Sequence, residues 1–321
     1  MLRSAASPGY LLERLGYIVV ILFVVSFVVF AVTQILPGNA AQMILGEQAL
    51  PEQLAALERR LGLDRPWYAQ YASWLGGLLQ GDWGNSMVMS RPVLPLVLTA
   101  LSRSFLLAAL ALVAVTAIAI PLGVLAAAKR GRPLDFSVSL FSYIGVSFPE
   151  FVTATLLLVF LARPEIGLFP AGGYTPPSEG FGKFLSHLVL PAITLTVILM
   201  AHISRQTRSE MIDALQQDYV RTATLKGLPR HVVLVRHALR NALLPTITVI
   251  ALDVGYLIGG IVVVEEVFAY PGLGRSLVFA MQNRDLPLIQ AGVLVVAATY
   301  AFANLAADLL YGWLDRRIQY K

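Results

Sequence analysis

The sequence has 321 residues, of which 57% are hydrophobic and only 13% are charged. Because a soluble domain carries about 25% charged residues, this composition excludes a soluble globular protein and indicates a chain that crosses a membrane several times. The formal net charge is +5 and cysteine is absent, which excludes a disulfide framework and thiolate metal sites in this chain. The apolar blocks are long and do not alternate in polarity, so we predict an all-α membrane protein.

The first apolar block, residues 17–36, follows a short N-terminal segment, residues 1–16. A secretory signal has an apolar core of only about 7–15 residues and a small-residue cleavage site. This block is longer and ends in Leu36-Pro37-Gly38. We therefore interpret it as a retained first transmembrane helix.

Residues 37–97 form a long connection, which we assign to an extracytoplasmic subdomain. Pro51-Glu52 is a favourable start for a short helix, and Gly62 is a favourable end. The connection is rich in aromatic residues, which fit a belt at the membrane interface and equally fit ordinary burial inside the subdomain. These aromatic residues are Trp67, Tyr68, Tyr71, Trp74 and Trp83.

Five more apolar blocks are long enough to cross a bilayer, which brings the predicted number of transmembrane helices to six. They cover residues 98–128, 136–161, 187–203, 242–264 and 288–313. The third transmembrane helix, residues 136–161, holds Pro149-Glu150 in its interior. The remaining segments are a basic stretch, an outer loop and a tail, at residues 204–241, 265–287 and 314–321.

The distribution of basic residues predicts the orientation of the chain. Six spans put both termini on one side, and that side carries 15 of the 24 Lys and Arg residues, whereas the opposite loops carry 8. Acidic residues show the reverse bias, with 6 on the terminal side and 10 on the other. By the positive-inside rule, both termini are cytoplasmic and the loop at residues 37–97 lies outside.

Sequence motifs of enzymes are absent. Neither H-E-x-x-H nor G-x-S-x-G nor a G-x-x-x-x-G-K-[ST] phosphate loop occurs in the sequence. His231 and His237 are six residues apart, which places them on different faces of a helix and makes them a poor metal pair. We predict a chain without catalytic residues, without a metal site and without a bound cofactor.

The basic stretch contains the segment around which the chain is organised, residues 218–245. Leu228-Pro229 marks a turn, because proline disfavours helix in the residue before it. Beyond the turn, Val232, Val235 and Leu239 recur at helical spacing. The pattern predicts a helix, a turn and a second helix at the cytoplasmic face. From spacing alone, this could be an interfacial connection whose arginines contact anionic lipid.

The same segment resembles the cytoplasmic coupling motif of ABC importer permeases, E-A-A-x3-G-x9-I-x-L-P. Arg221-Thr222-Ala223 and Gly227 match its first half, whereas Leu244-Pro245 stands five residues later than the motif's Leu-Pro. This departure is typical of the dipeptide/oligopeptide/nickel branch, and matches elsewhere extend the resemblance over nearly the whole chain. They are Leu36-Pro37-Gly38, Gly62-Leu63-Asp64-x-Pro66, Gly81-Asp82-x-Gly84-x-Ser86 and Glu265-x-Val267-Phe268-x-x-Pro271-Gly272-Leu273-Gly274.

The resemblance implies the type I ABC importer permease fold in the bacterial inner membrane, and it is closest to the first of two permeases. The implied partners are a second homologous permease, two ATPases that bind ATP and Mg, and an extracytoplasmic solute-binding protein, with membrane lipid around the chain and no nucleic acid. A short coupling helix near residues 219–229 would pass the movement of the ATPases to the membrane. The residues implied in coupling are Tyr219, Arg221, Thr222, Ala223, Lys226, Gly227, Leu228 and Pro229.

Ionisable residues inside the spans are the candidates for a substrate pathway, because they are costly in lipid and usually face a cavity or a partner. Glu150 follows Ser147 and Phe148 in the third transmembrane helix, and Asp253 lies near the middle of the fifth. We predict that these four residues line the pathway. The alternative is that the acids form hydrogen bonds between helices or with the second permease.

Cargo is the least determined property. Short peptides are expected, and nickel complexes, opines and glutathione are the alternatives within the same branch. A stand-alone secondary transporter or channel is the alternative from a different class. Such folds commonly carry inverted repeats, and we find no convincing repeat between residues 1–160 and 161–321.

Overall fold

The computed structural model describes residues 8–35, 50–61, 64–163, 165 and 167–314, and all regular structure in these ranges is helical. Several motifs noted in the sequence lie outside the described residues. They are Leu36-Pro37-Gly38, Gly62-Leu63 and residues 315–321 of the basic tail.

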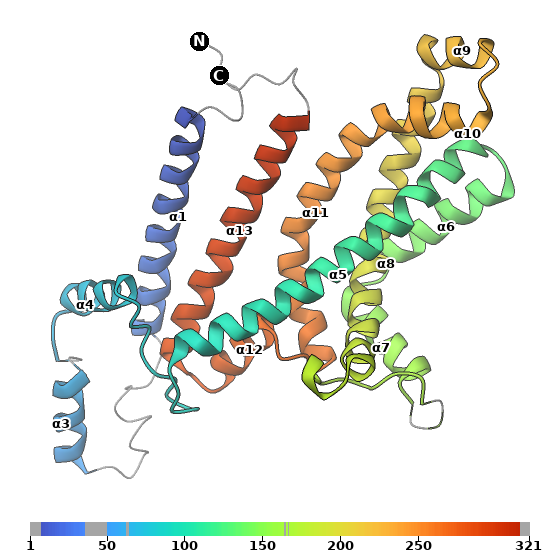
Figure 1. Ribbon diagram of the computed structural model, residues 1–321. Coiled ribbons are helices and arrows are strands. Elements are labelled where there is room, and N and C mark those ends of the chain that lie inside the picture. The colour runs from blue at the N-terminus through green and yellow to red at the C-terminus, as the bar shows by residue number, and fades with distance from the viewer. Residues whose placement is uncertain (1–7, 36–49, 62–63, 164, 166, 315–321) are drawn as a thin grey trace. The chain divides into compact units, whose positions relative to one another are not determined.

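The helices follow one another along the chain as shown in Figure 1. They are α1 (Pro8–Ile35), α3 (Pro51–Leu61), α4 (Trp67–Leu79), α5 (Val93–Ala128), α6 (Pro133–Ser147), α7 (Glu150–Leu161), the short 3-10 helix η1 (Pro177–Glu179), α8 (Phe181–Leu215), α9 (Asp218–Leu225), α10 (Arg230–Val232), the π-helix η2 (Val233–Leu239), α11 (Arg240–Val267), α12 (Leu273–Gln282) and α13 (Leu286–Leu314).

The number of spans agrees with the prediction of an all-α membrane protein. Within the described residues, five helical stretches are long and apolar enough to cross a membrane, and the bent pair α6–α7 brings the number to six if it counts as one span. The helices themselves run beyond the predicted spans. The fourth span was expected at residues 187–203, whereas α8 continues for 35 residues.

The third transmembrane helix differs from the prediction, because it is broken rather than continuous over residues 136–161. α6 ends at Ser147 and α7 begins at Glu150, and the two axes are bent by 106°. Phe148, between them, has extended backbone angles, φ −97° and ψ 128°. The cause is Pro149, which has no N–H to donate and disfavours helical angles in the preceding residue. The break places Glu150 in the first turn of a new helix.

The described chain forms two units. One contains the described residues of Met1–Leu12, Ser104–Pro271 and Phe302–Lys321, and the other contains Glu13–Arg103 and Gly272–Ala301. Three of the four unit boundaries fall inside the long helices α1, α5 and α13, and the fourth lies between α11 and α12. Both candidate functional sites lie in the first unit.

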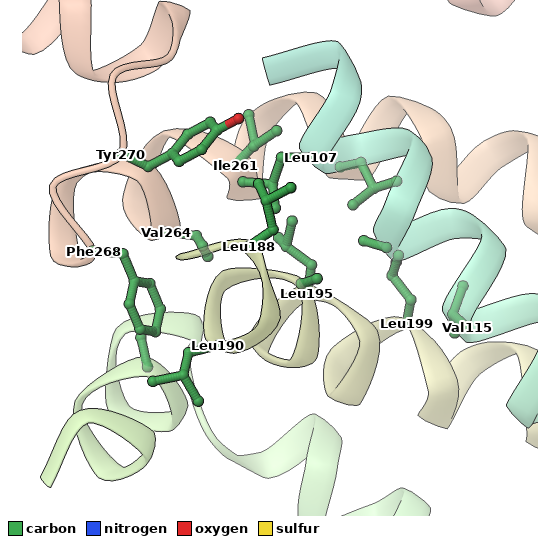
Figure 2. Packing of buried hydrophobic residues seen from close by; sticks show 14 of the residues in the cluster. Leu107, Val115, Leu188, Leu190, Leu195, Leu199, Ile261, Val264, Phe268 and Tyr270 are labelled. Carbon is green, nitrogen blue, oxygen red and sulfur yellow. The ribbon is translucent and has the colours of Figure 1, made fainter. Parts of the chain in front are cut away.

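The first unit is built around α8. In the most apolar 18-residue stretch of α8, 67% is buried inside the protein, whereas the corresponding share is 22–33% in the other four single-helix spans. α8 is therefore the central helix. Figure 2 shows Leu188, Leu195 and Leu199 of α8 packed toward α5 and α11. The neighbouring residues include Leu107 and Val115 of α5 and Ile261, Val264, Phe268 and Tyr270 from α11 and the turn after it. This apolar packing holds α5, α8 and α11 together as the frame for both sites.

The second unit contains the aromatic residues whose role the sequence left open, and burial inside the subdomain holds for Tyr71, while a role at the membrane interface stays a prediction. The Tyr71 ring packs against Phe27 and Phe30 of α1, with centroid distances of 5.7 and 5.3 Å. The hydroxyl groups of Tyr71 and Ser26 are 2.8 Å apart. Trp67 and Tyr68, at the start of α4, stay exposed. Tyr71 therefore joins α4 to α1, while Trp67 and Tyr68 are available to an interface.

Candidate coupling helix and intramembrane polar cluster

α9 is a helix of eight residues that follows directly on α8, and Figure 1 shows it at one end of α8, beside α10. It buries two side chains, Val220 and Ala223. They pack in one apolar cluster, which we call the α9 platform. The platform residues are Ala127 of α5, Met211 and Ala214 of α8, Val233 and Ala238 of η2, and Ala242 of α11. Because five of the eight members of this cluster are alanine, the helix backbones approach closely, and α9 packs directly on three long helices.

The opposite side of α9 and the turn after it are exposed. Of the eight residues implied in coupling, only Ala223 is buried. Leu225, beside them at the C-terminal end of α9, leaves 79% of its surface uncovered, and Tyr219 and Leu228 are exposed as well. Apolar side chains exposed on a short helix, with Arg221 and Lys226 beside them, are typical of a surface that binds another protein.

Gly227 ends the turn of α9 as the sequence predicted. Its φ is +75°, in the left-handed region, and its N–H donates to the Thr224 carbonyl at 3.0 Å. A Cβ at this position would meet no atom within 4 Å. The requirement for glycine is therefore conformational and does not come from a lack of space.

The second helix of the predicted helix–turn–helix is present, but its buried face differs from the prediction. Val235 was expected on the buried face and is exposed, whereas Val233 and Ala238 are buried. The reason is the π-helix η2, in which hydrogen bonds run from i to i+5, so the buried positions are five residues apart. Arg230, just before it, donates from Nη2 to the Ala128 carbonyl at 2.8 Å and ties this segment to the end of α5.

An ion pair between the buried Asp135 and the partly exposed Arg208 supports the platform from the side of α6. Arg208 of α8 donates from Nε and Nη2 to the two carboxylate oxygens of Asp135, at 2.5 and 2.8 Å. The Gly131 N–H also donates to Asp135, at 3.0 Å. The fork geometry fixes direction as well as distance, so the turn before α6 and the end of α8 are held in one orientation. The same two helices share a hydrogen bond between the hydroxyls of Ser142 and Ser204, 3.0 Å apart.

α5 and α8 are in close contact next to this ion pair. A Cβ at Gly123 would lie 2.6 Å from the Cβ of Thr207 and 2.7 Å from the carbonyl oxygen of Ser204. Only glycine fits there without a shift of one helix. α5, α6 and α8 therefore form a rigid block below α9.

A polar cluster lies on α7, α8 and α11, and it contains both of the acids that the sequence marked as pathway candidates. The Tyr256 hydroxyl of α11 donates to Glu150 Oε1 at 2.7 Å. A Cβ at Gly260, one turn further along α11, would lie 3.3 Å from the same carboxylate oxygen. The space beside Gly260 is therefore taken by the Glu150 carboxylate.

Asp253 is the second acid of the cluster. It is only 6% exposed, and its Oδ1 lies 3.5 Å from Nδ1 of His202 on α8. Its Oδ2 is buried and has no hydrogen-bond partner among the described residues. The His202 ring lies edge-on to Tyr256, with centroids 6.3 Å apart. Glu150, His202, Asp253 and Tyr256 thus form one group, which we call the polar cluster.

The other two pathway candidates lie at the break between α6 and α7. Phe148 is exposed, and the Ser147 hydroxyl donates to the Tyr143 carbonyl at 2.7 Å. Sequence reasoning missed His202 and Tyr256 of the polar cluster. Tyr256 could have been found from its position one helical turn after Asp253. For His202, the available signal was that a polar residue stands in an apolar helix. No group of three potential metal ligands occurs among the described residues.

Comparison with known proteins accounts for both halves of the chain. Residues 119–320 match the family model of the binding-protein-dependent transport system inner membrane component. Residues 9–100 match the model of the N-terminal part of the same transport membrane components. The chain belongs to this family of inner-membrane transport permeases. The prediction of an ABC importer permease in the inner membrane is therefore confirmed, and with it the type I permease fold.

Relatives of this inner membrane component align over almost its whole length. The dipeptide transport system permease protein DppB of Escherichia coli (strain K12) is 38% identical over 97% of this chain and 99% of the relative. The protein of the same name from Alkalihalophilus pseudofirmus is 37% identical with the same coverage. The oligopeptide transport system permease protein AppB of Bacillus subtilis (strain 168) is also 37% identical, again over 97% and 99%.

Proposed function

We propose that this permease belongs to an ATP-driven importer that carries short peptides from a solute-binding protein across the inner membrane. Full-length similarity to permeases named for dipeptide and oligopeptide transport supports the peptide cargo. Nickel complexes, opines and glutathione are the alternative cargoes. In this proposal the chain pairs with a second permease and binds no cofactor itself, while two ATPase subunits bind ATP and Mg.

The observation that best supports a coupling role is that α9 has one buried apolar side and one exposed apolar side. Its buried side rests on three long helices through small residues, and its other side exposes Leu225, Tyr219 and Leu228. A helix that served only as a connection in water would gain nothing from an apolar exposed side, whereas a surface that binds an ATPase requires one. We infer that an ATPase binds this side, and that closure of the ATPase pair pushes α9 against the platform. The packed helices then switch between discrete arrangements.

The polar cluster supports a pathway that passes beside α7 and α11. Glu150 and Tyr256 are partly exposed on this chain, although both belong to the spans. Such groups are costly against lipid and are normally turned toward a cavity or a partner. We infer that they face the path between the two permeases, together with Ser147 and Phe148.

The test is transport by the reconstituted complex in proteoliposomes, with radiolabelled dialanine as cargo. Wild-type uptake should require ATP and the binding protein. Leu225→Asp should lower uptake and binding-protein-stimulated ATP hydrolysis by about tenfold or more, because a charge replaces an apolar anchor in the ATPase contact. The amount of permease in the membrane should stay the same.

Leu79→Asp is the matched control, since Leu79 of α4 is 78% exposed and lies outside the coupling segment. It should leave ATP hydrolysis within about twofold of wild type, as surface substitutions usually do. Normal uptake and ATP hydrolysis with Leu225→Asp would contradict the coupling role. Uptake by this chain alone, driven by an ion gradient, would instead support a secondary transporter.

A further inference from the structure

We propose that the polar cluster is a binding site for a primary ammonium group, namely the free amino terminus of the peptide in transit. The inference deepens the proposed function and rests on it, because it assigns a chemical task to the pathway residues. It names Glu150 and Asp253 as the charged ligands and His202 and Tyr256 as the groups that hold them.

The first argument is the position of Glu150. The break at Pro149 turns α7 away from α6, and Glu150 then faces α11 from the first turn of α7. Tyr256 donates to one carboxylate oxygen, and Gly260 leaves room for it. The hydrogen bond from Tyr256 favours one fixed position of the carboxylate. Gly260 favours the same position, because it has no side chain to occupy this space.

The second argument is the hollow beside Glu150. It has a volume of ≈ 180 Å³ including its mouth, and Glu150, Tyr256 and Gly260 share its lining with apolar residues. The apolar residues are Leu195, Ile198, Leu199 and Leu257. In this lining only Glu150 carries a charge. Apolar walls lower the local dielectric constant and strengthen the attraction between a carboxylate and a cation.

The third argument is that Asp253 has a carboxylate oxygen that accepts no hydrogen bond from the described residues. Its side chain is more than nine-tenths buried, and Oδ2 has no partner among the described residues. A buried carboxylate oxygen without a donor costs free energy, so a native structure retains one where a ligand supplies the donor. The other oxygen, Oδ1, lies 3.5 Å from Nδ1 of His202. The cluster thus holds two acids and one imidazole, and it lacks a Lys or Arg side chain.

The fourth argument is access. The Tyr256 side is open, since 48% of this residue is uncovered on the isolated chain, and His202 is about one-third exposed. A peptide carries its charge at the amino end into the membrane, where an unpaired ammonium is strongly disfavoured. Two acids at that depth lower this cost. A primary ammonium donates up to three hydrogen bonds, and in this proposal the carboxylates of Glu150 and Asp253 are its acceptors.

The experiment uses the assembled complex and the absence of cysteine from this chain. Ser147→Cys places a single reactive thiol of this chain beside the break, three residues before Glu150. We measure its rate of modification by 2-aminoethyl methanethiosulfonate, which is a primary ammonium, and by the anionic 2-sulfonatoethyl reagent. After each rate is divided by the rate of the same reagent with a small free thiol in solution, the cationic reagent should react about tenfold faster. Glu150→Gln combined with Asp253→Asn should bring this corrected ratio near one.

Glu266→Gln is the control, because Glu266 is an exposed acid on α11 outside the cluster. It should leave the ratio within about twofold. An unchanged ratio in the Glu150→Gln/Asp253→Asn variant overturns the ammonium site. ATP-dependent dialanine uptake by the wild type is measured in parallel, so that failure of the proposed function is recognised separately.

The source of the ammonium is tested by protection of the same thiol. Dialanine should slow modification, whereas N-acetyl-dialanine, which has no ammonium, should not. Protection by N-acetyl-lysine amide supports a site for any primary ammonium, and its absence supports one for the peptide terminus alone. Equal protection by dialanine and N-acetyl-dialanine overturns the proposal.

Discussion

The α9 platform and the polar cluster are built on the same two helices, α8 and α11, by opposite means. The platform consists of small apolar residues in close contact, with its fixed orientation reinforced by the Asp135–Arg208 ion pair. The polar cluster consists of charged and hydrogen-bonding groups, one of which has an oxygen without a partner. The comparison teaches that the proposed coupling part depends on volume, whereas the proposed cargo-binding part depends on charge.

Gly123→Leu should have the largest effect, because it adds volume where α5 touches α8 below the platform. The new Cβ would lie 2.6 Å from that of Thr207, so one helix must move. Overpacking of this kind costs about 1–3 kcal/mol or more, which corresponds to a Tm roughly 5–10 °C lower. The measurement is thermal unfolding of the purified permease complex. Gly259→Leu on α11 is the control, since a Cβ there meets nothing within 4 Å. Equal losses in both variants would show that volume at the contact is not the cause.

Arg208→Gln should have the next largest effect, because it removes the two guanidinium hydrogen bonds to the carboxylate of Asp135. Asp135 is only 5% exposed while Arg208 is partly exposed, so we expect a loss of about 2 kcal/mol, between the values for surface and for buried pairs. The double variant with Asp135→Asn should be less damaging than Arg208→Gln alone. A double-mutant cycle measures this coupling, and strict additivity would argue that the pair does not hold α6 to α8.

Gly227→Val should act on coupling more than on stability. A left-handed backbone costs an L-residue about 1–2 kcal/mol, so valine shifts the turn after α9 and changes the surface offered to the ATPase. We expect uptake to be abolished while the chain still inserts into the membrane. Gly227→Asn is the matched variant, because asparagine tolerates the left-handed region, and it should keep most of the uptake. Normal uptake by a stably inserted Gly227→Val protein would exclude this role for the turn.

Asp253→Asn should have the smallest effect on stability, with the opposite sign. It replaces a buried, incompletely paired carboxylate by a neutral group of the same shape, and we expect a gain of about 1 kcal/mol, or roughly 2–4 °C in Tm. Dialanine uptake should fall at the same time. This is expected when a group that lowers the stability of the fold is kept because transport requires it. Asp213→Asn, an exposed acid on α8, is the control and should change neither quantity. A lower Tm with Asp253→Asn would show that the pair with His202 is a stabilising contact.

Local sequence signals were sufficient for the elements that depend on short-range physics. The apolar blocks marked the spans because a bilayer requires about 20 apolar residues in helix. Gly227 after a basic helix marked the end of α9, because only a residue without Cβ enters the left-handed region freely. In contrast, the bend at Pro149 was underestimated, since proline can either kink a helix or end it. Neighbouring packing decides between the two outcomes.

Side-chain partnerships were beyond the reach of the sequence. Arg208 and Asp135 are 73 residues apart, and Glu150 and Tyr256 are 106 apart. Their pairing requires α6, α7, α8 and α11 to pack in one arrangement, which no local pattern encodes. The buried face of η2 was missed for a related reason, because a π-helix shifts the register and is favoured only by its contacts.

The sequence by itself determined that this protein is a helical membrane protein with a basic stretch at residues 204–241, because hydropathy and turn residues act locally. Its motifs, rather than its composition, identified the permease family. Only the tertiary structure decided which acids face one another, which small residues lie under α9 and where the third span breaks. These features depend on distances between helices, and such distances are set by the packing of the whole unit.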